Sequence, residues 1–212
     1  MRSTLSDLLA DGRTLLADGA TGTNYFAAGL GSGDPPEFWT VDHPDRVQDL
    51  HRRFVEAGAD IILTNTFGCN PQRLKLHKAE ARTYELARRA AELAREVADA
   101  APRPVVVAGS VGPTGELFEP LGALTHEVAV ESFREQIRGL RDGGADVAWI
   151  ETMSAVEEVH AAATAAIAEG MPYVATCSFD TAGRTMMGLL PSHFERVFDI
   201  ERTAADLRLD WR

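Results

Sequence analysis

The chain has 212 residues, a length that suits one domain with a hydrophobic core. Hydrophobic residues make up 45% and charged residues 25% of it, as in ordinary globular proteins, and no apolar run approaches the ~18 residues that span a bilayer. The net charge is −11 and no Lys/Arg cluster has interleaved aromatic residues, which argues against nucleic acid or an anionic membrane as partner.

The N-terminal residues 1–7 lack the apolar core of a signal peptide. The only two cysteines, Cys69 and Cys177, cannot build a disulfide framework, which favours a reducing compartment. We therefore expect a cytoplasmic protein.

Five short apolar runs alternate along the chain with longer segments of helical periodicity. The runs are rich in Val and Ile and most are bounded by turn residues, which is typical of strands buried on both faces. The predicted strands cover residues 14–17, 60–64, 105–108, 147–150 and 173–176.

Between these runs, apolar residues recur every three or four positions, so each run is followed by a predicted helix. One helix starts at Pro44, another resembles a capping box at Ser154 and Glu157, and a last one begins after Pro191. The apolar faces of the helices contain Val47, Leu50, Phe54 and Val55; Leu86, Ala90, Leu93 and Val97; Val130, Phe133, Ile137 and Leu140; Val159 and Ala163; and Phe194, Val197 and Phe198.

A repeat supports this alternation. Residues 58–60 and residues 144–146 both read Gly-Ala-Asp, and each copy ends a helix and precedes a strand whose end turns polar. Parallel strands joined by helices form an α/β sheet with right-handed crossovers. An open doubly wound sheet is the alternative, but no Gly-x-Gly-x-x-Gly follows the first strand, and polar clusters follow every strand rather than one switch point.

The sequence therefore predicts a TIM (β/α)₈-type barrel of which only about five of the eight strand–helix units are present. A closed barrel of this kind typically needs ~250 residues. We expect residues 1–212 to form a single barrel domain that is incomplete at its C-terminus, with the first and fifth strands as unpaired edges. Such edges predict poor solubility or a homo-oligomer.

The carboxyl ends of the strands are where barrels of this kind carry their chemistry. Asp18 follows the first strand in a glycine-rich turn, and Glu151 directly follows the fourth. Two carboxylates from non-adjacent strands could bind a ligand ammonium, or act as acid and base if one pKa were raised. Each could instead accept hydrogen bonds from its own loop.

Other polar residues at the strand ends are less specific. Thr64, Asn65 and Thr66 can direct hydrogen-bonding groups into the barrel mouth or satisfy their own loop, and residues 112–115 (Gly-Pro-Thr-Gly) predict a turn. We interpret the two cysteines as ordinary packing side chains, and histidines 43, 51, 77, 126, 160 and 193 as surface or packing residues, because no metal-binding spacing is present.

Four of these segments together resemble the homocysteine S-methyltransferase family, which includes betaine–homocysteine methyltransferases and the homocysteine-binding module of cobalamin-dependent methionine synthase. They are residues 18–23 (Asp-Gly-Ala-Thr-Gly-Thr), 64–68 (Thr-Asn-Thr-Phe-Gly), 112–116 (Gly-Pro-Thr-Gly-Glu) and 151–153 (Glu-Thr-Met). The resemblance extends over about residues 8–198.

The resemblance implies a barrel that transfers a methyl group to homocysteine, giving methionine. It implies that two carboxylates hold the homocysteine ammonium and that nearby amides and hydroxyls help to bind its carboxylate. The implied substrate-binding residues are Asp18, Gly19, Ala20, Thr21, Thr64, Asn65, Thr66 and Glu151.

The resemblance also implies zinc, which would bind the substrate thiolate through three cysteines after the sixth strand and near the end of the barrel. Cys69 and Cys177 match none of these positions, so no metal ligand and no certain catalytic residue is assigned in this chain. The methyl donor stays open. Gly68 and Thr152 occupy positions where betaine enzymes carry aromatic residues, so a betaine donor is not supported.

Two alternatives to a working methyltransferase remain. The missing cysteines and open edges fit a truncated, non-catalytic homologue that acts only through self-association or a partner chain. An aldolase-like barrel would need a Schiff-base lysine at a strand end, but Lys75 and Lys78 lie in a predicted helix.

Overall fold

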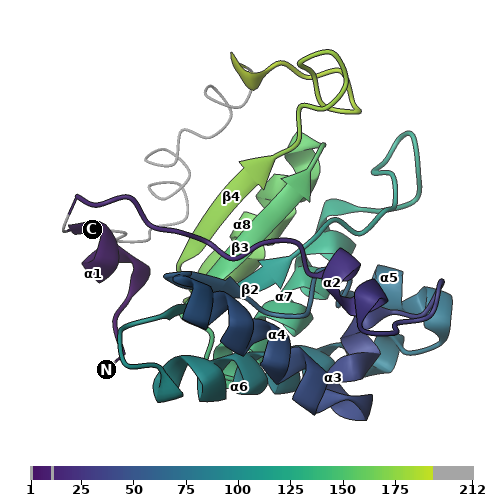
Figure 1. Cartoon of the computed structure of the whole chain (residues 1–212). Helices are drawn as coiled ribbons and strands as arrows, with labels where there is room; N and C mark the ends of the chain where they lie inside the picture. The colour runs from purple at the N-terminus through teal and green to yellow at the C-terminus, as the bar shows by residue number, and fades with distance from the viewer. Residues whose placement is uncertain (1, 11, 193–212) are drawn as a thin grey trace.

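The computed structural model describes residues 2–10 and 12–192, in which helices pack against one parallel sheet (Figure 1). The strands follow one another in the order β1-β2-β3-β4, and every pairing is parallel. This confirms the predicted α/β class. The helix expected around Phe194, Val197 and Phe198 lies outside the described residues. The strands are β1 (Ile61–Leu63), β2 (Val106–Val111), β3 (Val147–Met153) and β4 (Tyr173–Cys177).

The first predicted strand, residues 14–17, forms a single parallel bridge instead of a regular strand. Ala17 pairs with Ile61, and the Asp18 N–H donates to the Ile61 carbonyl at 2.9 Å. The Leu16 N–H donates to the Asp60 carboxylate at 3.0 Å rather than to a neighbouring strand, and 56% of Leu16 is exposed. In the described part of the chain this segment has a strand neighbour on one side only, so the ladder is short.

The predicted helices are present, with the expected faces buried. Val47, Leu50 and Val55 point inward from α4, which starts at Pro44 as predicted. The helices are α1 (Leu5–Ala10), α2 (Gly22–Ala27), α3 (Trp39–Asp42), α4 (Pro44–Ala57), α5 (Pro71–Leu74), α6 (Thr83–Ala100), α7 (His126–Asp142) and α8 (Val156–Ala168), with 3-10 turns η1 (Pro36–Phe38), η2 (Lys75–His77) and η3 (Glu80–Arg82).

The capping box predicted at Ser154 and Glu157 is wrong. The N-cap of α8 is Ala155, which makes no side-chain hydrogen bond. Strand β3 continues to Met153, so Ser154 belongs to the connection between β3 and α8. The N-cap lies one residue later than Ser154, and Ser154 and Glu157 therefore do not occupy the N-cap and N3 positions of a capping box.

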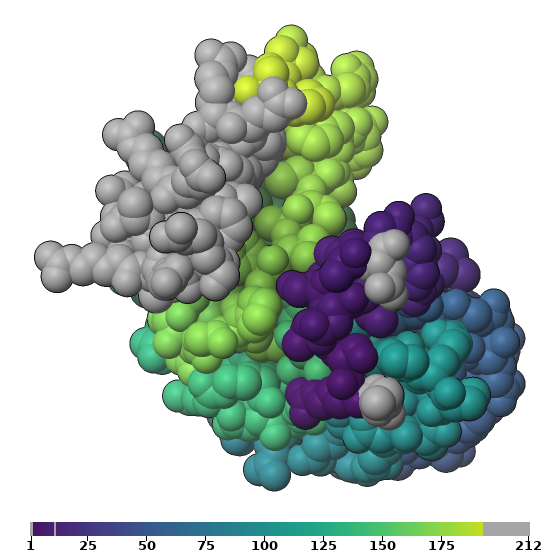
Figure 2. All heavy atoms as spheres, turned by 90° about the vertical axis from the view of Figure 1, so that its left-hand side faces the viewer, coloured from purple at the N-terminus to yellow at the C-terminus, as the bar shows by residue number. Residues whose placement is uncertain are grey.

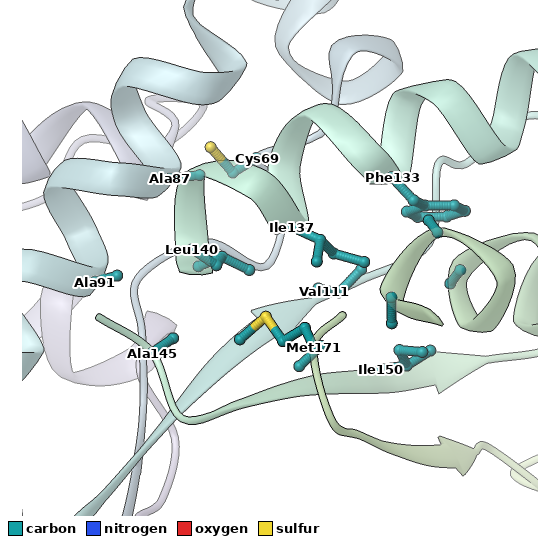
Figure 3. Close-up of a cluster of buried hydrophobic side chains, with 14 of the residues drawn as sticks. Cys69, Ala87, Ala91, Val111, Phe133, Ile137, Leu140, Ala145, Ile150 and Met171 are labelled. Carbon is teal, nitrogen blue, oxygen red and sulfur yellow. The ribbon is translucent and has the colours of Figure 1, made fainter. Parts of the chain in front are cut away.

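The four long helices lie side by side on one face of the sheet, where α4 packs on α6, α6 on α7 and α7 on α8. A sheet whose right-handed crossovers all run in the same direction places every helix on the same side. Between helices and sheet lies the main core, shown in Figure 3, which includes Cys69, Phe133, Ile137, Leu140 and Ile150. All four long helices lie on this one face, which contradicts the doubly wound alternative.

The opposite face of the sheet, which would face the inside of a barrel, has a smaller apolar cluster. Ile61, Val106 and Val147 of the sheet pack there with Leu8 of α1. The space-filling view shows the N-terminal residues (purple) lying over teal and green parts of the chain (Figure 2). In the described ranges, no helix is long and apolar enough to cross a membrane.

Candidate functional site

A cavity of about 740 Å³ opens at the carboxyl ends of the strands. Its size is within the range of small-molecule sites in proteins. Its walls come from the segment after the first bridge, from the loop that contains η1, from the residues after β1, and from the inward side of β2 and β3. All eight residues implied by the family resemblance line it: Asp18, Gly19, Ala20, Thr21, Thr64, Asn65, Thr66 and Glu151.

Asp18 is half-buried at the point where the first segment leaves the sheet. Its Oδ2 accepts the Leu63 N–H at 2.8 Å, so its position is fixed by the end of β1. The pKa of Asp18 is raised to about 7, mainly by burial and to a smaller extent by the nearby Glu151 charge, while the Leu63 hydrogen bond opposes this rise. This carboxyl group therefore changes its charge near neutral pH.

Glu151 extends into the cavity from β3, and the Ser110 hydroxyl of the neighbouring strand donates to its Oε1 at 2.5 Å. Burial raises the pKa of Glu151, while the Ser110 hydrogen bond lowers it. Two desolvated carboxyl groups that face one cavity would both be stabilised in their charged form by a bound cation.

Thr64 and Thr66 form a buried network with β2. The Thr66 hydroxyl donates to the Ser110 carbonyl at 2.7 Å, and the Ser110 N–H donates to the Thr64 hydroxyl at 3.0 Å. The two threonine oxygens lie 2.6 Å apart, so the Thr64 proton is directed at Thr66. Both hydroxyl protons are thus used inside the protein, and the two side chains can only accept from a ligand.

Asn65 connects two loops. Its Nδ2 donates to the Pro36 carbonyl at 2.7 Å and is 3.4 Å from the Thr40 hydroxyl. The side chain therefore holds the loop that contains η1 against the residues after β1 and forms part of the cavity wall.

Hydrogen-bond donors are nevertheless available in the segment that directly follows Asp18. The main-chain N–H groups of Gly19, Ala20 and Thr21 have no hydrogen-bond partner in the described part of the chain, and neither has the Thr21 hydroxyl. These groups line the same cavity as the two carboxylates. The cavity therefore presents both carboxylate acceptors and, in the described ranges, unpartnered donors, the two kinds of group that an ammonium and a carboxylate require.

Sequence reasoning missed several residues of the cavity. Glu37 is buried and accepts the Gly68 N–H at 2.7 Å, and burial raises its pKa. Arg73 and His77 line the same wall, although His77 was interpreted as a surface or packing residue. The signal was weak, because Glu37 lies in the short 3-10 turn η1, where no strand or helix periodicity predicts the direction of a side chain.

The two cysteines do not form a metal site. Cys69 is fully buried in the main core (Figure 3), its thiol lies 3.6 Å from the Thr83 carbonyl, and burial raises its pKa well above the usual range. Burial also raises the pKa of Cys177, at the end of β4, to about 11. Zinc binds thiolates, so neither sulfur fits a zinc ligand. Within residues 2–10 and 12–192, no group of three His, Cys, Asp or Glu side chains could hold a metal ion.

The sequence matches the family model described as homocysteine S-methyltransferase over residues 15–202. It is 33% identical over 199 residues to a methionine synthase of Mycobacterium tuberculosis and 32% identical over 191 residues to a methionine synthase of Mycobacterium leprae. These alignments cover 87% and 83% of this chain, but only 16% of each relative.

The fold is similar to crystal structures of the homocysteine methyltransferase MmuM from Escherichia coli. The metallated form gives a TM-score of 0.77 at 23% identity, over 90% of this chain and 72% of that one. The oxidized form gives 0.73 at 24% identity, over 93% and 70%. These similarities confirm the predicted architecture: the chain has the α/β fold of a TIM-type barrel and contains part of its strand–helix units.

Proposed function

This chain belongs to the homocysteine S-methyltransferase family, and from that premise we propose that its cavity binds the amino-acid part of homocysteine as the methyl acceptor. The observation that carries the proposal is the pair Asp18 and Glu151. They come from separate elements, line one cavity, and have pKa values raised by burial. An ammonium group between them would replace the lost solvation with charge-assisted hydrogen bonds.

The substrate carboxylate would lie on the donor side of the cavity. The main-chain N–H groups of Gly19, Ala20 and Thr21, with the Thr21 hydroxyl, are the donors left without partners in the described residues. Thr64, Asn65 and Thr66 would form the wall beside the substrate, since their own protons are already used. Binding both charged ends leaves the homocysteine side chain to extend toward the rest of the cavity.

For the protein as a whole we propose methyl transfer to the homocysteine thiol, giving methionine. In this reaction the sulfur loses its proton and bonds to the methyl carbon, and the donor leaves with the electron pair of the broken bond. A free thiol is mostly protonated at neutral pH, so the reaction needs thiolate activation. Within the described residues no group of three His, Cys, Asp or Glu side chains could hold a metal ion for this step, and we assign no ligands.

The cavity wall around Gly68 gives an indication of which class of methyl donor the protein uses. A side chain at this position would meet the Glu37 carboxylate, because a Cβ atom built there lies 2.9 Å from Glu37 Oε1. An aromatic residue at position 68 is thus incompatible with the present position of Glu37. This agrees with the expectation that the sequence does not support a betaine donor, which needs aromatic contacts for its quaternary ammonium.

The first test is a calorimetric titration of homocysteine into the wild-type chain and the Glu151→Gln variant. Loss of one charge-assisted hydrogen bond predicts about 10- to 100-fold weaker binding for Glu151→Gln. Glu116→Gln is the matched control, because Glu116 is exposed and does not line the cavity. Equal affinity of the Glu151→Gln variant and the wild type would end the proposal.

The second test is elemental analysis of the purified chain for zinc, with and without homocysteine. We expect much less than one zinc per chain, because the described residues supply no ligand set. Homocysteine binding without zinc would favour a chain that binds the acceptor but does not activate it. One tightly bound zinc per chain would contradict this expectation and indicate a site shared with other residues or subunits.

A further inference from the structure

Strand β3 contains a bulge at the cavity. Ile150 pairs with Ala175 and Met153 with Cys177, so the two residues Glu151 and Thr152 lie opposite a single residue of β4. Thr152 has a φ of 62°, in the left-handed region. A β-branched residue in that region is a conformational outlier, and such strain persists only where the surroundings enforce it.

The bulge changes which side of the sheet the following residue occupies. Trp149 and Glu151 line the cavity, whereas Ile150 between them is buried in the core beneath the helices. Strict alternation would place Met153 on the cavity side with Glu151. The extra residue instead returns Met153 to the helix side, where it is fully buried.

Both ends of the bulge are anchored. Ile150 and Met153 are each 0% exposed, and the Ser178 N–H donates to the Met153 carbonyl at 3.0 Å. The Thr152 side chain, in contrast, is exposed and has no hydrogen bond in the described part of the chain. The strained conformation therefore follows from packing on either side and not from contacts of the threonine itself.

We propose that Thr152 is a positioning residue whose left-handed backbone fixes the Glu151 carboxylate against Ser110 and toward the ligand. Ile150 and Met153 hold the two ends, so the backbone of the two residues between them is constrained, and this constraint sets the direction in which Glu151 enters the cavity. Because the free protein already holds Glu151 in this orientation, ligand binding costs less side-chain conformational entropy. The effect on homocysteine rests on the proposed function; the effect on Glu151 does not.

The experiment compares Thr152→Gly, Thr152→Asn and the wild type. Glycine adopts positive φ without strain but is free to leave it, whereas asparagine tolerates the left-handed region better than threonine does. Ala182→Gly is the matched control, because Ala182 also has positive φ (52°) but lies outside the cavity. The readouts are the melting temperature, the titration of the Glu151 carboxyl by ¹³C NMR, assigned with Glu151→Gln, and the affinity for homocysteine.

We expect Thr152→Gly to melt no lower than the wild type, yet to bind homocysteine about fivefold more weakly. Its Glu151 titration midpoint should fall toward that of an ordinary glutamate as the carboxylate gains access to water. Thr152→Asn should retain the wild-type midpoint and affinity, and Ala182→Gly should change neither.

A Thr152→Gly chain with the wild-type midpoint would overturn the inference. A failure of that variant to fold would also overturn it, because the threonine side chain would then be required for the stability of the fold. If the wild type does not bind homocysteine, the proposed function fails, but the Glu151 titration in the free protein still decides whether Thr152 positions the carboxylate.

Discussion

At the scale of single residues, the site depends on two carboxyl groups, Asp18 and Glu151, which burial makes weaker acids than they are in water. Burial is the main cause of the raised pKa of Asp18, and the neighbouring Glu151 charge adds to it. A pKa of about 7 means that Asp18 is part protonated at neutral pH in the free protein. A bound ammonium would favour the charged form and lower this pKa.

This predicts pH-dependent binding. As the pH rises from about 6 through about 7, Asp18 loses its proton, so we expect homocysteine affinity to increase several-fold over this interval. The increase ends where the substrate ammonium itself begins to titrate, near pH ~8 or above. Calorimetric titrations at several pH values measure this, and Asp18→Asn should flatten the profile as well as weaken binding.

The same group makes stability pH-dependent in the opposite sense. The folded pKa of Asp18, about 7, lies above its ordinary value of 3.8, so the folded state binds the proton more tightly. Its contribution to the free energy of unfolding is complete below about pH 4 and is lost as the pH rises to about 7. The free energy of unfolding, measured with denaturant at several pH values, should therefore change with pH differently in the wild type and in Asp18→Asn over this interval. The same pH dependence in both proteins would contradict the raised pKa.

At the scale of elements, the repeated Gly-Ala-Asp segments have a structural explanation. Asp60 accepts the Leu16 N–H and pairs with Arg13, while Asp146 accepts the Val107 N–H and pairs with Arg95. Each aspartate lies just before a strand and accepts an N–H from the strand segment that precedes it in the chain. It thus fixes the register between the two and neutralises an arginine. The repeat predicted by the sequence belongs to this end of the sheet, opposite the cavity.

Removal of one of these aspartates should destabilise the fold. The Asp146 side chain is only 4% exposed and accepts from the Val107 N–H and Arg95 at 2.8 Å. Asp146→Ala therefore leaves the Val107 N–H without its acceptor and removes the buried carboxylate partner of Arg95, which in the described residues keeps only Asp99 and the Val105 carbonyl. We expect a loss of about 3 kcal/mol in the free energy of unfolding, measured by urea denaturation.

The control for this prediction is Asp49→Ala. Asp49 pairs with Arg52 at the surface, where both side chains are more than half exposed, so its loss should cost less than about 1 kcal/mol. A similar loss for both variants would show that burial of the Asp146 pair does not decide its contribution.

At the scale of the whole molecule, the described sheet does not close. Helices cover one face, and the opposite face has only the small cluster around Ile61, Val106 and Leu8. The chain spans 16% of the length of the methionine synthases that it matches, and about 70% of an MmuM chain. In the described ranges the bridge at Ala17 and strand β4 mark the two sides of the sheet.

The open sheet predicts self-association of the 212-residue chain. Leu16 is 56% exposed beside β1, and apolar surface next to unpaired strand groups favours pairing with another chain. We expect dimers or larger species by size-exclusion chromatography with light scattering at micromolar concentration. A monomer with a sharp, reversible melt would contradict this prediction and the idea that the chain acts only through self-association.

Much of the molecule was predictable because it depends on local periodicity. The apolar spacing in α4, α6 and α7 and the Val/Ile-rich runs of β2 and β3 indicate buried faces directly. Asp18 and Glu151 were found because residues that follow parallel strands meet at one end of the sheet. The regular first strand and the capping box were mispredicted, since both depend on where neighbouring elements stop.

The sequence by itself therefore determined the α/β class, the order of the main elements and eight of the residues that line the cavity. Only the tertiary structure decided which groups remain free for a ligand: it uses the protons of Thr64, Asn65 and Thr66 internally and leaves the amides of Gly19–Thr21 without partners. It also brought Glu37 into the wall and placed the bulge at Thr152. These features depend on contacts between residues distant in sequence, which no local pattern encodes.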